Sequence, residues 1–155
     1  MFKKPILLLA AILAPQVAIA GSAPPPQLSL TDDEVFLSAS WTFGQQSFIP
    51  QTELGYRNVD VESDGDVNGA GVSISFDWTN FGFDKIKLVG IKGNDNTQGL
   101  LGFGYSLQQQ QWLGTAGVQG NHLFINADLL RENGFQFGGG VNTISDYDRP
   151  SFNIF

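Results

Sequence analysis

The chain has 155 residues, no cysteine and a formal net charge of −7, with 15 acidic side chains against 8 lysines and arginines. A chain of this length predicts a single domain, and its negative charge argues against binding to a phosphate backbone, so no nucleic-acid partner is expected. The lack of cysteine excludes a disulfide scaffold and a thiolate metal site. Stability must therefore come from packing or from a closed, hydrogen-bonded sheet.

The first twenty residues have the pattern of a secretory signal peptide. Lys3 and Lys4 precede an apolar run from Ile6 to Ala14, and Ala18-Ile19-Ala20 is a small-residue cleavage signal. The run is too short for a membrane-spanning helix, which needs about 20 residues. We therefore expect cleavage near Ala20 and export of the mature chain.

Residues 21–34 are interpreted as an N-terminal tether, and residues 35–155 as the folded domain. The tether contains three consecutive prolines, Pro24 to Pro26. These favour an extended polyproline conformation and cannot join the middle of a sheet.

The rest of the chain contains eight stretches that alternate apolar and polar residues with a period of two, which is typical of β-strands. In one of them Val72, Ile74 and Phe76 share one face, while Ser73 and Ser75 share the other. The predicted strands span 35–43, 52–62, 70–78, 85–92, 99–107, 111–119, 122–130 and 135–143. Short connections rich in Gly, Asn and Asp indicate hairpins and an antiparallel up-and-down meander.

In most of these strands the polar face is too hydrophilic for a protein core, which favours a barrel that is apolar outside and wet inside. We therefore predict an all-β fold, an eight-stranded antiparallel up-and-down (meander) β-barrel of the membrane type. Eight strands leave an interior only wide enough to be filled by side chains. Several glycines fall on the predicted inward face, where space is scarce: Gly102, Gly104, Gly117, Gly138 and Gly140.

The stretch 52–62 departs from the alternation, because Asn58 and Asp60 fall on its outward, otherwise apolar face. Two explanations are open. The strand either contains a bulge or leaves the membrane early.

Six charged side chains fall on the predicted inward face. Buried charges are tolerated only when they are paired. We therefore predict an interior network of salt bridges and hydrogen bonds that plugs the lumen, which argues against a diffusion pore. The predicted members are Glu53, Arg57, Asp77, Lys85, Lys87 and Asp128.

Large aromatic side chains gather toward the rim formed by the connections after the first, third, fifth and seventh strands. An aromatic girdle at a membrane interface is one explanation, and a hydrophobic cap on a soluble sandwich is the other. The predicted girdle consists of Trp41, Phe43, Trp78, Phe81, Phe83 and Trp112. The turns of the opposite rim are acidic.

One acidic turn, from Asp64 to Gly69, matches the opening of a calcium-binding loop. The glutamate that such a loop needs at its twelfth position is replaced by Ser75, although a neighbouring acidic residue could supply an oxygen. Asp-Gly is also a common hairpin turn. Calcium on Asp64, Asp66 and Asn68 is therefore one hypothesis and a plain turn the other, and no further cofactor is expected.

We predict no catalytic residues and no enzymatic activity. His122 is the only histidine, and although it shares a face with Asp128, six residues of strand separate the two by roughly 20 Å. The chain has neither a phosphate-binding loop nor a dinucleotide fingerprint.

The pattern resembles the small bacterial outer-membrane β-barrel superfamily, of the OmpA-transmembrane and OmpX type. The resemblance covers roughly Val35 to Phe155, through fragments such as Leu54-Gly55-Tyr56-Arg57 and Gly102-Phe103-Gly104-Tyr105-Ser106. It implies contact with outer-membrane lipid, insertion by the barrel-assembly machinery that reads a terminal phenylalanine such as Phe155, and both termini in the periplasm. The aromatic rim would then face the cell exterior and the acidic turns the periplasm.

The leading hypothesis is a non-enzymatic outer-membrane barrel with a plugged polar interior and a structural or envelope-stress role. Its outer loops are short, since the longest runs from Gly44 to Gln51 and offers a partner little surface. One alternative is a soluble secreted or periplasmic β-sandwich or barrel that acts as a binding module, with its apolar face turned inward. A second is a small lipid-modifying membrane-barrel enzyme.

Overall fold

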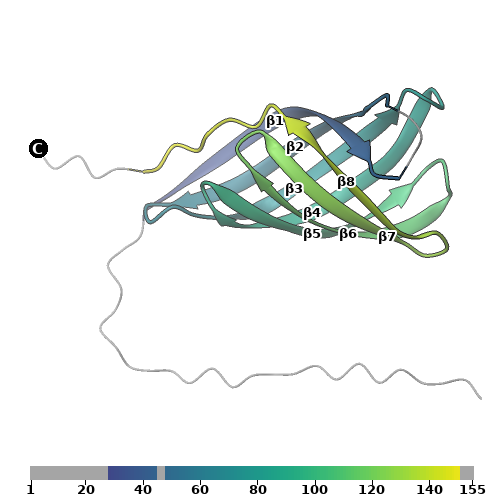
Figure 1. The fold of residues 1–155 in the computed structure, drawn as a ribbon. Helices are drawn as coiled ribbons and strands as arrows, with labels where there is room; N and C mark the ends of the chain where they lie inside the picture. Colours follow the sequence, from purple (N-terminus) through teal and green to yellow (C-terminus); the bar gives the residue numbers. More distant parts are fainter. Residues whose placement is uncertain (1–27, 45–47, 151–155) are drawn as a thin grey trace, which may run out of the picture.

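The computed structural model describes residues 28–44 and 48–150, so the predicted signal peptide and residues 21–27 of the predicted tether lie outside the described residues. The strands are β1 (Ser29–Thr42), β2 (Gln51–Glu62), β3 (Asp66–Asp77), β4 (Gly82–Asn94), β5 (Thr97–Ser106), β6 (Gln111–Gly120), β7 (Leu123–Leu130) and β8 (Gly134–Asn142). Each pairs antiparallel with the next, and β8 returns to β1 (Figure 1). The predicted closed meander barrel of eight strands is therefore confirmed.

The start of β1 differs from the prediction. Residues 29–34, which the sequence assigned to the tether, pair with residues 57–62 of β2. The charged side chains at Asp32, Asp33 and Glu34 break the apolar alternation there, but the backbone continues the ladder because residues 57–62 of β2 offer it partners. β1 thus begins at Ser29, six residues before the predicted first strand.

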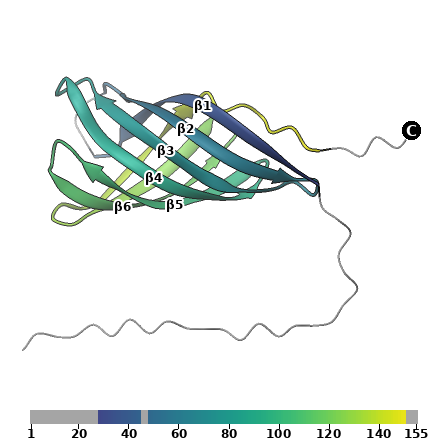
Figure 2. The ribbon, with the colours of Figure 1, turned by 180° about the vertical axis from the view of Figure 1, so that it is seen from behind.

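The barrel is longer on one side than on the other. β1 to β4 have 12 to 14 residues, whereas β5 to β8 have 8 to 10. β8 pairs only with Ser38 to Thr42 of β1, so the long strands extend beyond the closed ring and converge on a tip (Figure 2). We call this the acidic end, because the turns there carry Asp64 and Asp95.

This extension explains the polar outward residues of β2. The pairing of β2 with both neighbours is continuous across Asn58 and Asp60, so no bulge occurs there. Asp60 instead lies on the extension, where it accepts a hydrogen bond from Thr31. A register shift is found between β3 and β4, at Ile74 and Phe76, near the opposite end.

The distribution of side chains is the reverse of that in a soluble protein, because polar and charged side chains are buried and large hydrophobic ones are exposed. The most deeply buried large side chains include Arg57, Gln98 and Asp128, each at most 2% exposed. Every strand contributes exposed, outward-pointing hydrophobic residues to an apolar band around the barrel. The band comprises Val35, Leu37, Leu54, Tyr56, Val72, Ile86, Leu88, Leu101, Phe103, Val118, Ile125, Phe137 and Val141.

A small apolar cluster occupies the interior at the acidic end. It consists of Val59, Val61, Val67 and Ile91, with Tyr147 packed against it. The described part of the chain contains no helix long and apolar enough to cross a membrane.

The tight curvature of the ring explains two inward-facing glycines. A Cβ atom on Gly102 would lie 2.0 Å from the carbonyl oxygen of Leu88, and one on Gly140 would lie 2.0 Å from the carbonyl oxygen of Ala39. No side chain fits at such a distance from the neighbouring backbone. Glycine here allows adjacent strands to approach closely, which is a common reason for glycine within a strand.

Candidate functional site

The candidate site is the polar interior of the barrel, and its centre is the carboxylate of Asp128 on β7. Oδ2 of Asp128 accepts both Lys85 Nζ, at 2.9 Å, and Lys87 Nζ, at 3.0 Å. Oδ1 accepts the hydroxyl of Thr115, at 2.8 Å, and the amide of Asn126, at 3.2 Å. This set, the Asp128 network, satisfies both carboxylate oxygens and links β4, β6 and β7.

Strand periodicity explains why these groups meet. Lys85 and Lys87 are two residues apart on β4, as are Asn126 and Asp128 on β7, so each pair points to one face of its strand. Lys85 also donates a hydrogen bond of 3.1 Å to the side chain of Gln136 on β8. Because β4 and β8 lie on opposite sides of a ring of eight strands, these contacts cross the lumen.

A second network surrounds Arg57, nearer to the acidic end. Nη2 of Arg57 pairs with Glu34 Oε2 at 2.7 Å, and Nη1 donates to the hydroxyl of Tyr147 at 2.7 Å. The guanidinium carbon lies 4.7 Å from the centre of the Tyr147 ring, within reach of a cation–π interaction. Burial raises the pKa of Tyr147, and the carboxylates of Asp32 and Glu34 act in the same direction against Arg57. The phenol is therefore neutral at neutral pH.

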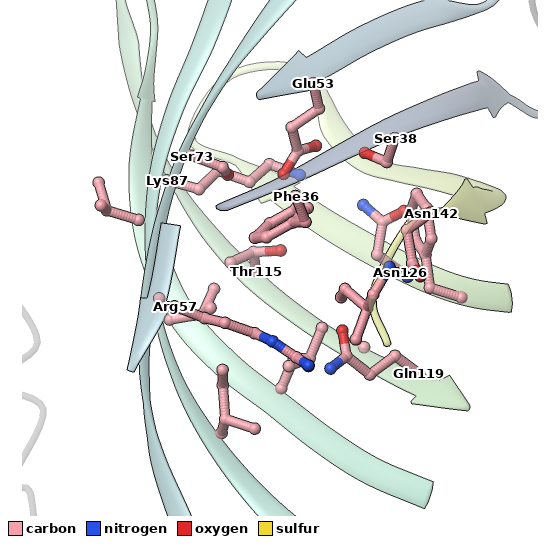
Figure 3. Close-up of a pocket in the computed structure, with 18 residues that line it drawn as sticks. Phe36, Ser38, Glu53, Arg57, Ser73, Lys87, Thr115, Gln119, Asn126 and Asn142 are labelled. Atoms are coloured by element: carbon pink, nitrogen blue, oxygen red, sulfur yellow. Dashed lines mark hydrogen bonds between the residues drawn. The ribbon is translucent and has the colours of Figure 1, made fainter. Parts of the chain in front are cut away.

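A cavity of about 70 Å³ lies between the two networks (Figure 3). Glu53, Arg57 and Lys87 line it together with apolar side chains such as Phe36 and Ile144. A second cavity of about 20 Å³ lies beside the Asp128 network, and Glu53 and Lys87 line both. A buried water needs about 10–15 Å³ of such volume, so these cavities have room for only a few water molecules.

Four of the predicted interior residues form ion pairs. Lys85 and Lys87 both pair with Asp128, whereas Arg57 pairs with Glu34 in the second network. Glu53 lines the shared cavities, but it takes no part in the ion pairs found among residues 28–44 and 48–150.

Asp77 is a correction, because it does not join the interior network. It is the last residue of β3, and its carboxylate accepts hydrogen bonds from the backbone N–H of Thr79, at 2.8 Å, and from the side chain of Asn80, at 2.7 Å. Aspartate commonly stabilises a turn in this way, by accepting from the backbone two residues later. The turn to β4 therefore uses the side chain that the alternation placed in the lumen.

Several residues of the two networks escaped prediction. Thr115 and Gln136 carry no charge, so the rule that buried charges must be paired does not predict them. Glu34 was missed because it was assigned to the tether, although it has the same strand parity as the inward Ser38. Tyr147 follows the last strand, where no periodicity predicts its direction.

All six residues of the predicted girdle lie at one rim and are exposed: Trp41, Phe43, Trp78, Phe81, Phe83 and Trp112. The indole N–H groups of two of them have acceptors, since Trp41 donates to the carbonyl of Phe48, at 3.1 Å, and Trp78 to the hydroxyl of Thr52, at 2.8 Å. The polar N–H group of each of these two indoles is therefore satisfied within the protein. Their role at a membrane interface stays a prediction.

The turn from Asp64 to Asn68 has the geometry of a hairpin connection. Asp64 Oδ1 accepts the backbone N–H of Asp66 at 3.2 Å, and Gly65 has a φ of 93°. Residues 28–44 and 48–150 contain no group of three histidine, aspartate or glutamate side chains placed to hold a metal ion. The calcium hypothesis for Asp64, Asp66 and Asn68 stays a prediction that a calcium titration would test.

His122 lies in the turn before β7, exposed and with a φ of 61°. Its carbonyl accepts the backbone N–H of Asn142 at 3.0 Å. The hydrogen bond that His122 makes here is thus one of its backbone, and it joins the turn before β7 to the end of β8.

No protein-family model matches the chain, and comparison with curated proteins and with solved structures found no match. The resemblance to small outer-membrane barrels stays a prediction based on the sequence pattern.

Proposed function

We propose that the chain is a non-enzymatic outer-membrane β-barrel protein with a filled polar interior and a structural or envelope-stress role. The proposal includes removal of the signal peptide near Ala20 and insertion into the outer membrane by the barrel-assembly machinery. The observation that carries it is the inverted side-chain distribution. Charged groups meet inside the ring, while the apolar band faces outward from every strand.

The size of the apolar band supports a lipid environment. Contiguous apolar patches on soluble monomers rarely exceed a few hundred Å². Here large hydrophobic side chains are exposed around the whole ring, with Leu101 at 73%, Val35 at 65% and Ile125 at 62%. Contact of this surface with lipid tails carries no hydrophobic free-energy penalty, whereas its exposure to water does.

The backbone also suits a membrane. A segment in hydrocarbon must satisfy its own N–H and C=O groups, which a closed barrel does and an open sheet does not. Strands of about 9–11 residues cross a bilayer when tilted. Eight strands of 8 to 14 residues in a closed ring meet both conditions approximately, and the polar extension at the acidic end lies beyond the band.

A structural role is supported by the connections at the aromatic rim. Those after β3, β5 and β7 contain only three or four residues between strands. Small barrels with binding or adhesive roles would need larger loops to form a contact surface there. The interior of the barrel is occupied by side chains of the barrel strands, which leaves room for only a few water molecules.

The test is the substitution Leu101→Arg, in the middle of β5. If Leu101 faces lipid, an arginine there costs ~2 to 4 kcal/mol and lowers the amount of protein in the outer-membrane fraction that shows heat-dependent mobility on gels. The matched control is Asn68→Arg, which adds the same side chain outward on the polar extension and should assemble normally. Recovery of the unmodified protein in the aqueous fraction, or equal assembly of Leu101→Arg and Asn68→Arg, would contradict the proposal.

A further inference from the structure

Residues 143–150, which follow β8, lie across the open end of the barrel. Asn142 is the last residue of β8 that pairs with β1, and Thr143 makes the last contact of this ladder, donating its N–H to the carbonyl of Leu37 at 2.9 Å. Beyond Thr143 the chain leaves β1 and contacts other parts of the acidic end. Figure 1 shows this segment, in yellow, beyond the end of β8.

Three contacts fix the segment, each on a different element. Ser145 donates both its backbone N–H and its hydroxyl to Glu34 Oε1 on β1, each at 3.0 Å. The hydroxyl of Tyr147 accepts from Arg57 on β2. Arg149 pairs with Asp95, in the turn between β4 and β5. Since β4 lies opposite β8 in the ring, the segment spans the mouth from one side to the other.

The segment also completes the interior. Ile144 is only 7% exposed and forms part of the wall of the 70 Å³ cavity. Tyr147 packs against the apolar cluster of Val59, Val61, Val67 and Ile91. This cluster lies on the inner face of β2 to β4, and Val89 and Leu100 pack against it together with Tyr147.

We propose that residues 143–150 form a strap that closes the acidic end of the barrel, and that release of the strap exposes the inner cavity to solutes in the surrounding water. The aromatic end needs no such segment, because Leu113 and Leu130 fill the ring there and are buried by the strands themselves. The acidic end is sealed by a piece of chain held through side-chain contacts. It is therefore the end at which the barrel opens most readily. This inference rests on barrel geometry and not on the proposed membrane location.

The test measures access to the cavity with a water-soluble maleimide in the full-length protein in detergent. The chain has no cysteine, so Ser38→Cys places a single thiol on the cavity wall, at a position that is 5% exposed. Combining it with Tyr147→Ala should speed labelling about tenfold or more, as expected for the loss of a hydrogen bond to a charged group. Arg149→Ala, which removes only the exposed ion pair, should give a smaller increase.

Controls separate strap release from general unfolding. Asn68→Cys, exposed on β3, should label at the same fast rate with and without the strap substitutions. Heat-dependent gel mobility should show that the barrel is still folded, and Tyr147→Phe replaces Tyr147→Ala if the latter does not fold. Equal labelling of Ser38→Cys with an intact and a substituted strap would overturn the proposal. An equal increase with Asp33→Asn, an exposed substitution outside the strap, would also overturn it.

Discussion

At the scale of single residues, Asp128 holds the interior together. Its carboxylate is 2% exposed and carries the only negative charge within ion-pair distance of Lys85 and Lys87 among the described residues. Removing one partner from a buried ion pair costs more than the pair itself contributes, because the remaining charge stays buried without compensation. Two lysines on the same face of β4 would then lie side by side inside the barrel without a counter-charge.

We therefore predict that Asp128→Asn lowers the free energy of unfolding by about 3–5 kcal/mol. Equilibrium unfolding in urea, followed by tryptophan fluorescence of the detergent-solubilised protein, would measure the loss. Asp33→Asn removes a carboxylate that is exposed on the extension of β1, and should change stability by about 0.5 kcal/mol or less. A similar stability for the two variants would show that the lysines do not depend on Asp128.

The sequence predicted several of the charges that face inward, but not how they pair. A period of two fixes the face of each residue on its strand, and this placed Arg57, Lys85, Lys87 and Asp128 correctly. Pairing depends on the stagger between strands, which alternation does not determine. Asp77 was misplaced for a related reason, since at the last residue of a strand local turn geometry decides the direction of the side chain.

At the scale of elements, glycine determines how closely two strands approach. Gly102 on β5 lies against the backbone of Leu88 on β4, where an added Cβ would overlap the carbonyl oxygen. Gly114 on β6 has no atom within 4 Å of the same position. The same substitution by alanine therefore meets a filled site at Gly102 and an empty one at Gly114, which makes the two positions a matched pair.

We predict that Gly102→Ala destabilises the barrel by about 1–3 kcal/mol, as expected when a group is forced into a filled site. Gly114→Ala should leave stability unchanged or slightly higher, because alanine restricts the unfolded chain without a clash. Urea midpoints of the two variants would give the comparison. Equal destabilisation would show that glycine acts through β-propensity and not through close approach.

The ends of a strand were predicted correctly where the alternation of apolar and polar residues begins or stops at the strand end. They were missed where the strand continues with polar residues on its outward face. β2, β6, β7 and β8 begin and end within one residue of their predicted positions. β1, β3 and β4 extend farther toward the acidic end, because their outward residues there are polar and carry no alternating signal. β4 also begins three residues earlier at the aromatic end, at Gly82. Backbone pairing, which needs no apolar face, continues beyond the band.

At the scale of the whole molecule, the interior is filled. The Asp128 network crosses the lumen, and the cavities beside it measure about 70 and 20 Å³. An eight-stranded ring has little room beyond its own side chains. The fold class could be predicted from alternation and turns alone, whereas the strap could not, since residues 143–150 show no period of either strand or helix.

We predict that the purified protein does not make vesicles permeable to small sugars. After reconstitution into lipid vesicles, osmotic swelling in sugar solutions should not exceed that of vesicles without protein. Rapid swelling would mean that the lumen contains a wider water-filled path than the two cavities.

The ring is joined unequally around its circumference. β1 pairs with β2 through twelve residue pairs but with β8 through five. Seven of the eight junctions are hairpins between consecutive strands, so they form between residues that are near each other along the polypeptide. The remaining junction must bring together residues about a hundred positions apart, at a greater loss of loop entropy. The β1–β8 junction therefore combines the largest entropic cost with the fewest residue pairs of the eight. We expect it to close last during folding and to be the first of the eight to separate.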